Sequence, residues 1–146
     1  MGDLQKGRSV GRSIWALFLG FIVVVALSLG TDLALHAAGI YPELGKRMTE
    51  TLFVAATAYR TLYGVIGSYV TARFAPNKPM QHALLGGAIG FVLATIGAVA
   101  TWNKDLGPHW YPLALIATAL PAAWVGAKLW MASVSREIVL DREGKY

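Results

Sequence analysis

The sequence predicts an all-α membrane protein, an up-down bundle of four transmembrane helices with both termini in the cytoplasm. Of its 146 residues, 55% are hydrophobic and only 14% are charged, whereas soluble domains carry about 25% charged residues. The apolar residues form blocks of about 20 residues, enough at helical rise to cross a hydrocarbon core about 30 Å thick. Helices are expected because an open strand in lipid would leave backbone polar groups without hydrogen-bond partners.

Helix-breaking residues separate the apolar blocks. Pro76 and Pro79 follow the second block, and Gly107-Pro108 precedes the fourth. We treat residues 1–146 as a single transmembrane domain. The expected helices cover residues 14–38, 51–73, 80–102 and 110–134, followed by a charged tail at residues 135–146.

The first block has an alternative interpretation. Lys6, Arg8 and Arg12 precede an apolar run, as in a signal peptide, and Ala37 or Ala38 would then mark the cleavage site. Because the apolar run is long for the core of a signal peptide, we expect an uncleaved helix.

The basic residues outside the apolar blocks are distributed unevenly. Nine lie before the first helix, between the second and third, or in the last part of the chain; only Lys46, Arg47 and Lys104 lie in the other two loops. The positive-inside rule places the richer side in the cytoplasm. We therefore expect a multi-pass protein of the cell's inner (plasma) membrane with both termini in the cytoplasm.

The composition also limits the function. The net charge of +5 comes from residues that flank apolar blocks, so the expected partner is the lipid bilayer and not nucleic acid. The chain has no cysteine, which excludes disulfides, thiolate metal sites and cysteine nucleophiles. No glycine-rich phosphate loop, GxSxG elbow or paired inward carboxylate motif is present. A non-enzymatic role is therefore favoured over an enzymatic one.

Small residues recur at a spacing of four in two of the expected helices. Gly86, Gly90 and Ala94 share one face of the third helix, and Gly64 and Ser68 share one face of the second. Such rows let helix backbones approach closely in lipid. They serve either to hold the monomer together or to form a homodimer or a larger membrane complex.

Two charges interrupt the apolar blocks, Asp32 in the first and Arg60 in the second. A guanidinium near the middle of a membrane helix costs a contested ~2.5 to over 10 kcal/mol, so it needs a partner. Arg60 lies about 15 Å from the outer end of its helix, and its side chain points back toward the helix N-terminus and toward Asp32. We expect an ion pair, with Tyr59 and Tyr63 as further hydrogen-bonding groups. Residues of the first outer loop and of the start of the fourth helix could close over it: Tyr41, Glu43, Glu50, His109, Trp110 and Tyr111. The pair either fixes helix register or forms a ligand site.

Two histidines fall at outer helix ends, His36 on the first helix and His109 on the fourth. If these helices were neighbours, both imidazoles could bind haem. Two histidines without HxxxH or HExxH spacing are a weak signal. We therefore expect interfacial or capping roles, with no cofactor and no metal, and keep haem as the alternative.

Three strings carry a resemblance to a known group: TDLALHAAGIYP (Thr31–Pro42), ATAYRTLYGVIGSY (Ala56–Tyr69) and GPHWYPLAL (Gly107–Leu115). They resemble small, uncharacterised bacterial four-helix transmembrane proteins, a resemblance that covers most of the chain and implies the fold but no activity. Four short helices are also similar to small multidrug transporters. Those rely on a glutamate within the first helix, whereas this chain has Asp32 nearer the outer edge.

The predicted function is that of a small integral membrane protein, a non-enzymatic accessory or binding module with an outer-leaflet polar pocket around Asp32 and Arg60. The alternative is a small transporter or a lipid-handling membrane enzyme in which Arg60 binds an anionic group. A guanidinium can grip a phosphate or a carboxylate with two parallel hydrogen bonds. The candidate ligand-binding residues are Arg60, Asp32, His36, Tyr59, Tyr63 and His109.

Overall fold

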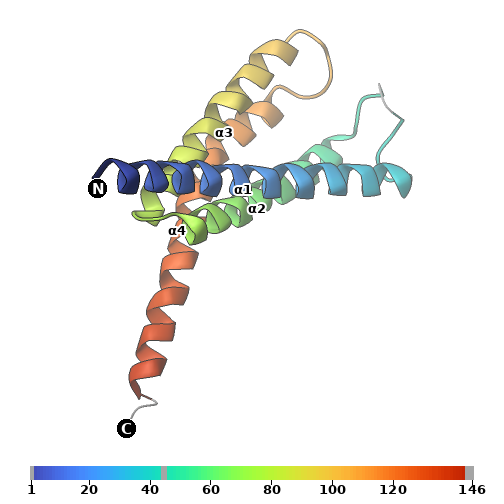
Figure 1. Ribbon diagram of the computed structural model, residues 1–146. Helices are drawn as coiled ribbons and strands as arrows, with labels where there is room; N and C mark the ends of the chain where they lie inside the picture. The colour runs from blue at the N-terminus through green and yellow to red at the C-terminus, as the bar shows by residue number, and fades with distance from the viewer. Residues whose placement is uncertain (1, 44–45, 144–146) are drawn as a thin grey trace.

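A computed structural model describes residues 2–43 and 46–143. This part of the chain contains four helices and no strand, which confirms the all-helical prediction (Figure 1). The helices are α1 (Gly2–Ala37), α2 (Glu50–Phe74), α3 (Pro79–Thr101) and α4 (Trp110–Glu143).

Three of these helices are long and apolar enough to cross a membrane, over residues 9–37, 79–101 and 110–141. The helix α2 is less apolar, because Arg60 and several hydroxyl-bearing residues lie along it. Both end helices exceed their apolar blocks. The helix α1 begins before Lys6, and α4 continues into the charged tail, since lysine, arginine and glutamate are good helix formers. Residues 144–146 of the predicted tail lie outside the described residues.

The helices form two hairpins that cross each other. In Figure 1, α1 and α2 run together as one pair, and α3 and α4 form a second pair that crosses the first and spreads away from it. The helix α4 packs on α2 and α3, and α1 packs on α2 and α3. Among the described residues, α1 and α4 make no helix-to-helix contact. The arrangement differs in this respect from a bundle whose helices stay side by side along their full length.

Glycines determine where the helices cross. A Cβ atom on Gly20 of α1 would meet the Thr71 hydroxyl and the Gly67 carbonyl of α2. A Cβ atom on Gly126 of α4 would meet the Val65 carbonyl of α2 in the same way. The absence of a side chain at these points lets the backbones approach closely, which favours helix association in lipid.

The predicted small-residue rows make looser contacts. A Cβ atom built on Gly64 meets Ala122 of α4 at 3.4 Å, and one built on Gly86 meets Leu17 of α1 at 3.5 Å, whereas one built on Gly90 meets nothing within 4 Å. Ser68 packs beside Gly126 on α4. The other member of the row on α3, Ala94, lines a cavity described below.

We call the end of the fold with the connection between α2 and α3 its inner end, and the opposite end, with the other two connections, its outer end. The inner end holds a buried apolar cluster. Ala72, Ala83 and Ala127 are almost fully buried there, and Met80 and Trp130 pack against them. A short connection, residues 75–78, joins α2 to α3 at this end, and Pro79 occupies the first turn of α3, where a proline costs no hydrogen bond. The helix pairs are therefore held together at the inner end and separate toward the outer end.

Candidate functional site

The centre of the candidate site is the pair formed by Asp32 of α1 and Arg60 of α2. The Arg60 Nη2 atom donates to Asp32 Oδ2 at 2.5 Å. The Asp32 side chain is 21% exposed and the Arg60 side chain is 34% exposed. The structure thus places side by side the two charges that the sequence brings to the outer half of these helices, and it leaves both partly accessible.

The second oxygen of the Asp32 carboxylate accepts a hydrogen bond from the first of two linked tyrosine hydroxyl groups. The Tyr59 hydroxyl donates to Asp32 Oδ1. Because this uses its single hydrogen, Tyr59 accepts from the Tyr41 hydroxyl, 2.9 Å away. Both carboxylate oxygens therefore have partners, and Tyr41 in the first outer loop joins the network.

The other predicted site residues on these two helices lie around this network. The Tyr63 hydroxyl is 2.7 Å from the Thr31 hydroxyl, and the Tyr63 ring lies against Tyr59 with 5.6 Å between ring centroids. The Nδ1 atom of His36 lies 2.8 Å from the Asp32 carbonyl, and the His36 ring meets Tyr41 edge-on. The network therefore ties α1, the first outer loop and α2 to one another.

The arginine keeps unused hydrogen-bond donors. Its Nε atom is buried and has no hydrogen-bond partner in the described part of the chain. Asp32 and the Tyr59 hydroxyl are the hydrogen-bonding neighbours of the guanidinium, so most of its five N–H groups remain unused by the described residues. A buried donor without a partner carries a desolvation cost of about 1–3 kcal/mol, so Asp32 does not satisfy the guanidinium completely.

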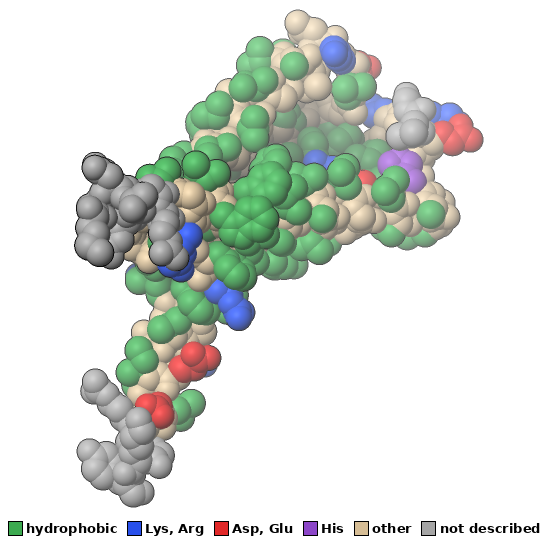
Figure 2. Space-filling view, viewed as in Figure 1, with side chains coloured by type: hydrophobic (Ala, Val, Ile, Leu, Met, Phe, Trp, Pro, Cys, Tyr) green, Lys and Arg blue, Asp and Glu red, His purple; other side chains and the backbone are tan. Residues whose placement is uncertain are grey.

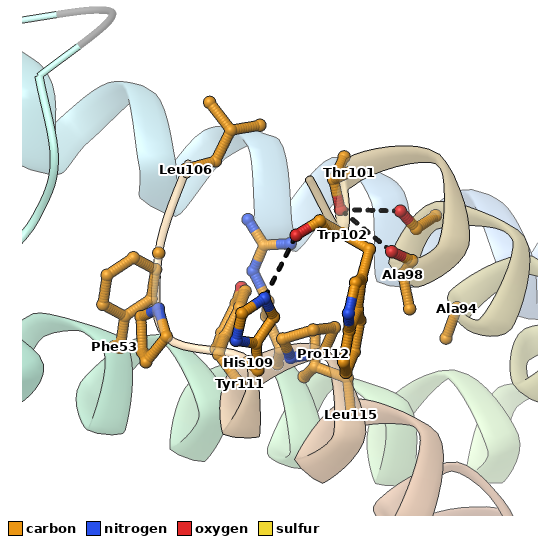
Figure 3. Close-up of a pocket in the computed structure, with 14 residues that line it drawn as sticks. Phe53, Ala94, Ala98, Thr101, Trp102, Leu106, His109, Tyr111, Pro112 and Leu115 are labelled. Atoms are coloured by element: carbon orange, nitrogen blue, oxygen red, sulfur yellow. Dashed lines mark hydrogen bonds between the residues drawn. The ribbon is translucent and has the colours of Figure 1, made fainter. Parts of the chain in front are cut away.

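Arg60 also lines a cavity of about 360 Å³ between α2, the outer end of α3 and the beginning of α4 (Figure 3). Ala94, Gly97, Ala98 and Thr101 form its side on α3. Its volume lies at the lower end of the range for small-molecule sites. The remaining walls are mostly apolar or aromatic and include Phe53, Trp102, Leu106, Pro108, His109, Tyr111, Pro112 and Leu115.

The aromatic walls hold one another in place. The His109 ring stacks on Trp102 with 4.4 Å between centroids, and His109 Nε2 donates to the Trp102 carbonyl at 3.1 Å (Figure 3). The Tyr111 ring packs against Phe53, with 5.0 Å between centroids. Its hydroxyl interacts electrostatically with the Arg60 guanidinium and makes no hydrogen bond to any described residue. Tyr111 is therefore a second available donor beside Arg60.

The two predicted histidines have different partners. His36 belongs to the network of Asp32 and Tyr41, whereas His109 belongs to the cavity wall with Trp102. Among the described residues, no group of three or more histidine, aspartate or glutamate side chains is arranged to hold a metal ion.

The connection between α3 and α4 forms the outer wall of the cavity through Leu106, Gly107 and Pro108. Arg47 Nη1 donates to Asp105 Oδ1 at 2.9 Å, and Trp110 Nε1 donates to Glu50 Oε2 at 2.9 Å. Gly107 of this connection lies directly against the Phe53 ring, so closely that a Cβ atom would meet it. These contacts fasten the connection to the outer end of α2.

Comparison with known proteins adds no function to this geometry. Compared with models of protein families, with curated proteins and with solved structures, the chain matches none of them. The function must therefore be argued from the site itself.

Of the cavity residues, Phe53 and Trp102 are absent from those that the sequence brings to the site, whereas Tyr111 is among the residues expected to close over it. In the sequence, aromatic residues near helix ends are typical of the membrane interface. The string GPHWYP concentrates aromatic and helix-breaking residues around His109. This was the one sequence signal that pointed to a cavity wall at this place. Only the packing of α4 on α2 brings that string to Arg60.

Proposed function

We propose that the protein is a non-enzymatic membrane module that binds the acidic group of a membrane amphiphile at Arg60. One observation carries this proposal: Arg60 lines a largely apolar cavity, its side chain stays 34% exposed, and Asp32 and Tyr59 leave most of its N–H groups unused. A phosphate or carboxylate accepts from a guanidinium with planar, bidentate geometry. Apolar walls and a few placed polar groups are the usual composition of a ligand site.

Asp32 weakens the attraction for an anion but does not remove it. An acidic group about 4 Å from the guanidinium is attracted by about 4 kcal/mol at an effective dielectric of about 20, whereas a carboxylate about 7 Å away repels it by about 2.4 kcal/mol. The balance remains favourable. In return, Asp32 holds the guanidinium in one orientation, which reduces the entropy lost on binding.

The proposal includes a location and an orientation: the protein lies in the inner (plasma) membrane, α2 is its fourth transmembrane helix, and both termini face the cytoplasm. It is supported by the excess of basic residues on one side. The helix α2 has 25 residues, about 37 Å at helical rise, which is sufficient for a span. Its charge at Arg60 is offset by Asp32, so the cost of placing it in lipid is reduced.

A binding role fits the side chains better than a catalytic one. The Asp32 oxygens already accept from Tyr59 and Arg60, so this carboxylate is not free to act as a base. The unused groups facing the cavity, at Arg60 and Tyr111, are hydrogen-bond donors suited to holding an oxygen-rich group.

Arg60→Lys tests the proposal with little change to the fold. The lysine ammonium can still pair with Asp32, but it lacks the second edge of the guanidinium. We expect the affinity for lysophosphatidic acid, a phosphomonoester with one acyl chain, to fall about tenfold or more, since hydrogen bonds to charged groups contribute about 1.5–3 kcal/mol. Native mass spectrometry of detergent-purified protein measures the bound fraction and also reports whether the chain is a homodimer.

Arg73→Gln provides the control on the same helix. Arg73 is exposed at the inner end of α2 and stacks on Trp130, so its loss should leave binding unchanged. Equal binding by the wild type and the Arg60→Lys variant would contradict the proposal. So would equal losses in the Arg60→Lys and Arg73→Gln variants.

A further inference from the structure

A gap between α1 and α3 gives access to the site from the side. These helices touch near their inner ends, where His82 Nε2 lies 2.8 Å from Ser13 Oγ and Gly86 lies beside Leu17. Toward their outer ends they diverge (Figure 1). Figure 2 shows a hollow between the pair of α1 and α2 and the pair of α3 and α4, with basic and acidic side chains at its floor. Arg60 keeps 34% of its side chain exposed.

The two helices that border this gap carry exposed apolar side chains on their outer halves. Leu33 on the outer half of α1 is 70% exposed, and Val99 on the outer half of α3 is 74% exposed. Both residues belong to segments that are long and apolar enough to span a membrane. The gap between these two helices is therefore at the depth of lipid chains.

The route from water is obstructed by comparison. The connection between α3 and α4 covers the outer side of the cavity and is fastened by two polar contacts, Arg47 with Asp105 and Trp110 with Glu50. The Phe53 ring fills the space beneath Gly107. A ligand entering from water would have to displace this connection, whereas a ligand entering from the bilayer would not.

We infer that the ligand is an acidic amphiphile of the outer leaflet that enters laterally between α1 and α3, places its anionic head at Arg60 and leaves its chain in the gap. This inference rests on the proposed function and adds the source of the ligand and its route. The positive guanidinium complements the head, and the exposed apolar faces of α1 and α3 complement the chain. A water-soluble anion has the same head chemistry but nothing to bury in the gap.

The first test compares two ligands with one head group. Lysophosphatidic acid carries a chain, whereas glycerol 3-phosphate is the same phosphomonoester without it. We expect the wild type to bind lysophosphatidic acid and a large excess of glycerol 3-phosphate to leave it bound. If glycerol 3-phosphate displaces it, the lateral-entry inference is wrong while the proposed function stands. If neither ligand depends on Arg60, both fail.

The second test fills the cavity without touching Arg60. Gly97 lines the cavity and Gly90 does not, yet a Cβ atom at either position on α3 meets nothing within 4 Å. Gly97→Phe should therefore reduce lysophosphatidic acid binding at least tenfold, and Gly90→Phe should leave it unchanged. Unchanged binding in the Gly97→Phe variant, or equal losses in both variants, would overturn the inference.

The third test fastens the outer connection. Because the chain has no cysteine, the variant Arg47→Cys/Lys104→Cys, which leaves the positive-φ residue Asp105 unchanged, can be joined selectively by a short bis-maleimide. We expect the joined protein to bind lysophosphatidic acid at the same rate as the unjoined variant. A large decrease in that rate on joining would show that the ligand enters beneath the connection, which contradicts lateral entry.

Discussion

Replacing Asp32 with leucine is expected to destabilise the protein by about 3 kcal/mol, because Arg60 loses its counter-ion. Removing one partner of a buried ion pair costs about 3–5 kcal/mol, and the partial exposure of Arg60 places this pair at the lower end. The Tyr59 hydroxyl loses its acceptor in the same substitution. Unfolding in mixed detergent micelles with an increasing fraction of denaturing detergent measures the free energy of unfolding.

A double substitution separates the cost of the lone charge from the value of the pair. In Asp32→Leu/Arg60→Leu no unpaired guanidinium remains, so we expect most of the lost stability to return. The exposed pair of Arg47 and Asp105 is the comparison, and Asp105→Asn should cost less than about 1 kcal/mol. Asparagine is chosen because Asp105 has a positive φ of 46°. A double variant as unstable as the single one would contradict this explanation.

Replacing Gly20 with leucine is expected to prevent α1 from packing on α2. The new side chain would meet the Thr71 hydroxyl and, more seriously, the Gly67 carbonyl, which is backbone and cannot rotate away. Overpacking costs about 1–3 kcal/mol and occasionally more, and here it acts at the closest point of the crossing. We expect a loss of folded protein after detergent extraction, measured by the monodisperse fraction in size-exclusion chromatography.

Gly30→Leu is the matched control on the same helix. A Cβ atom at Gly30 meets nothing within 4 Å, so the same change in size and hydrophobicity should be tolerated there. If the Gly20→Leu and Gly30→Leu variants fold equally well, the crossing described for α1 and α2 is wrong.

The helical fold could be predicted from the sequence because lipid leaves few choices. Apolar blocks of this length must be helical in a membrane. The proximity of Asp32 and Arg60 could also be predicted, since alternating helix direction places both in the outer half and an arginine side chain points toward the start of its helix. Both inferences depend on local properties of the chain and on one general rule of topology.

The crossing of the hairpins could not be predicted in the same way. Many small residues lie on these helices, and their spacing does not show which face meets which neighbour. The row of Gly86, Gly90 and Ala94 is the most regular in the sequence, yet closer approaches occur at Gly20, Gly67 and Gly126. Hydropathy measures how apolar a helix is and contains no information on its rotation about its own axis.

The cavity depends on that rotation, which explains why several of its wall residues were missed. Tyr111 and Trp102 line the same cavity as Arg60 only because α4 begins beside the outer half of α2, and because the connection folds over Phe53. The same dependence separates His36 from His109, since α1 and α4 make no contact among the described residues. Contacts between segments that are distant in the sequence therefore determine both the walls of the cavity and the separation of the two histidines.

The most direct measurement is an experimental structure of the protein in a lipid nanodisc with a bromine-labelled lysophosphatidic acid. The proposal predicts that the phosphate lies within hydrogen-bonding distance of the Arg60 guanidinium, beside Tyr111, with the brominated chain between α1 and α3. A cavity that holds no phosphate while the labelled lipid lies only around the outside of the helices would contradict it.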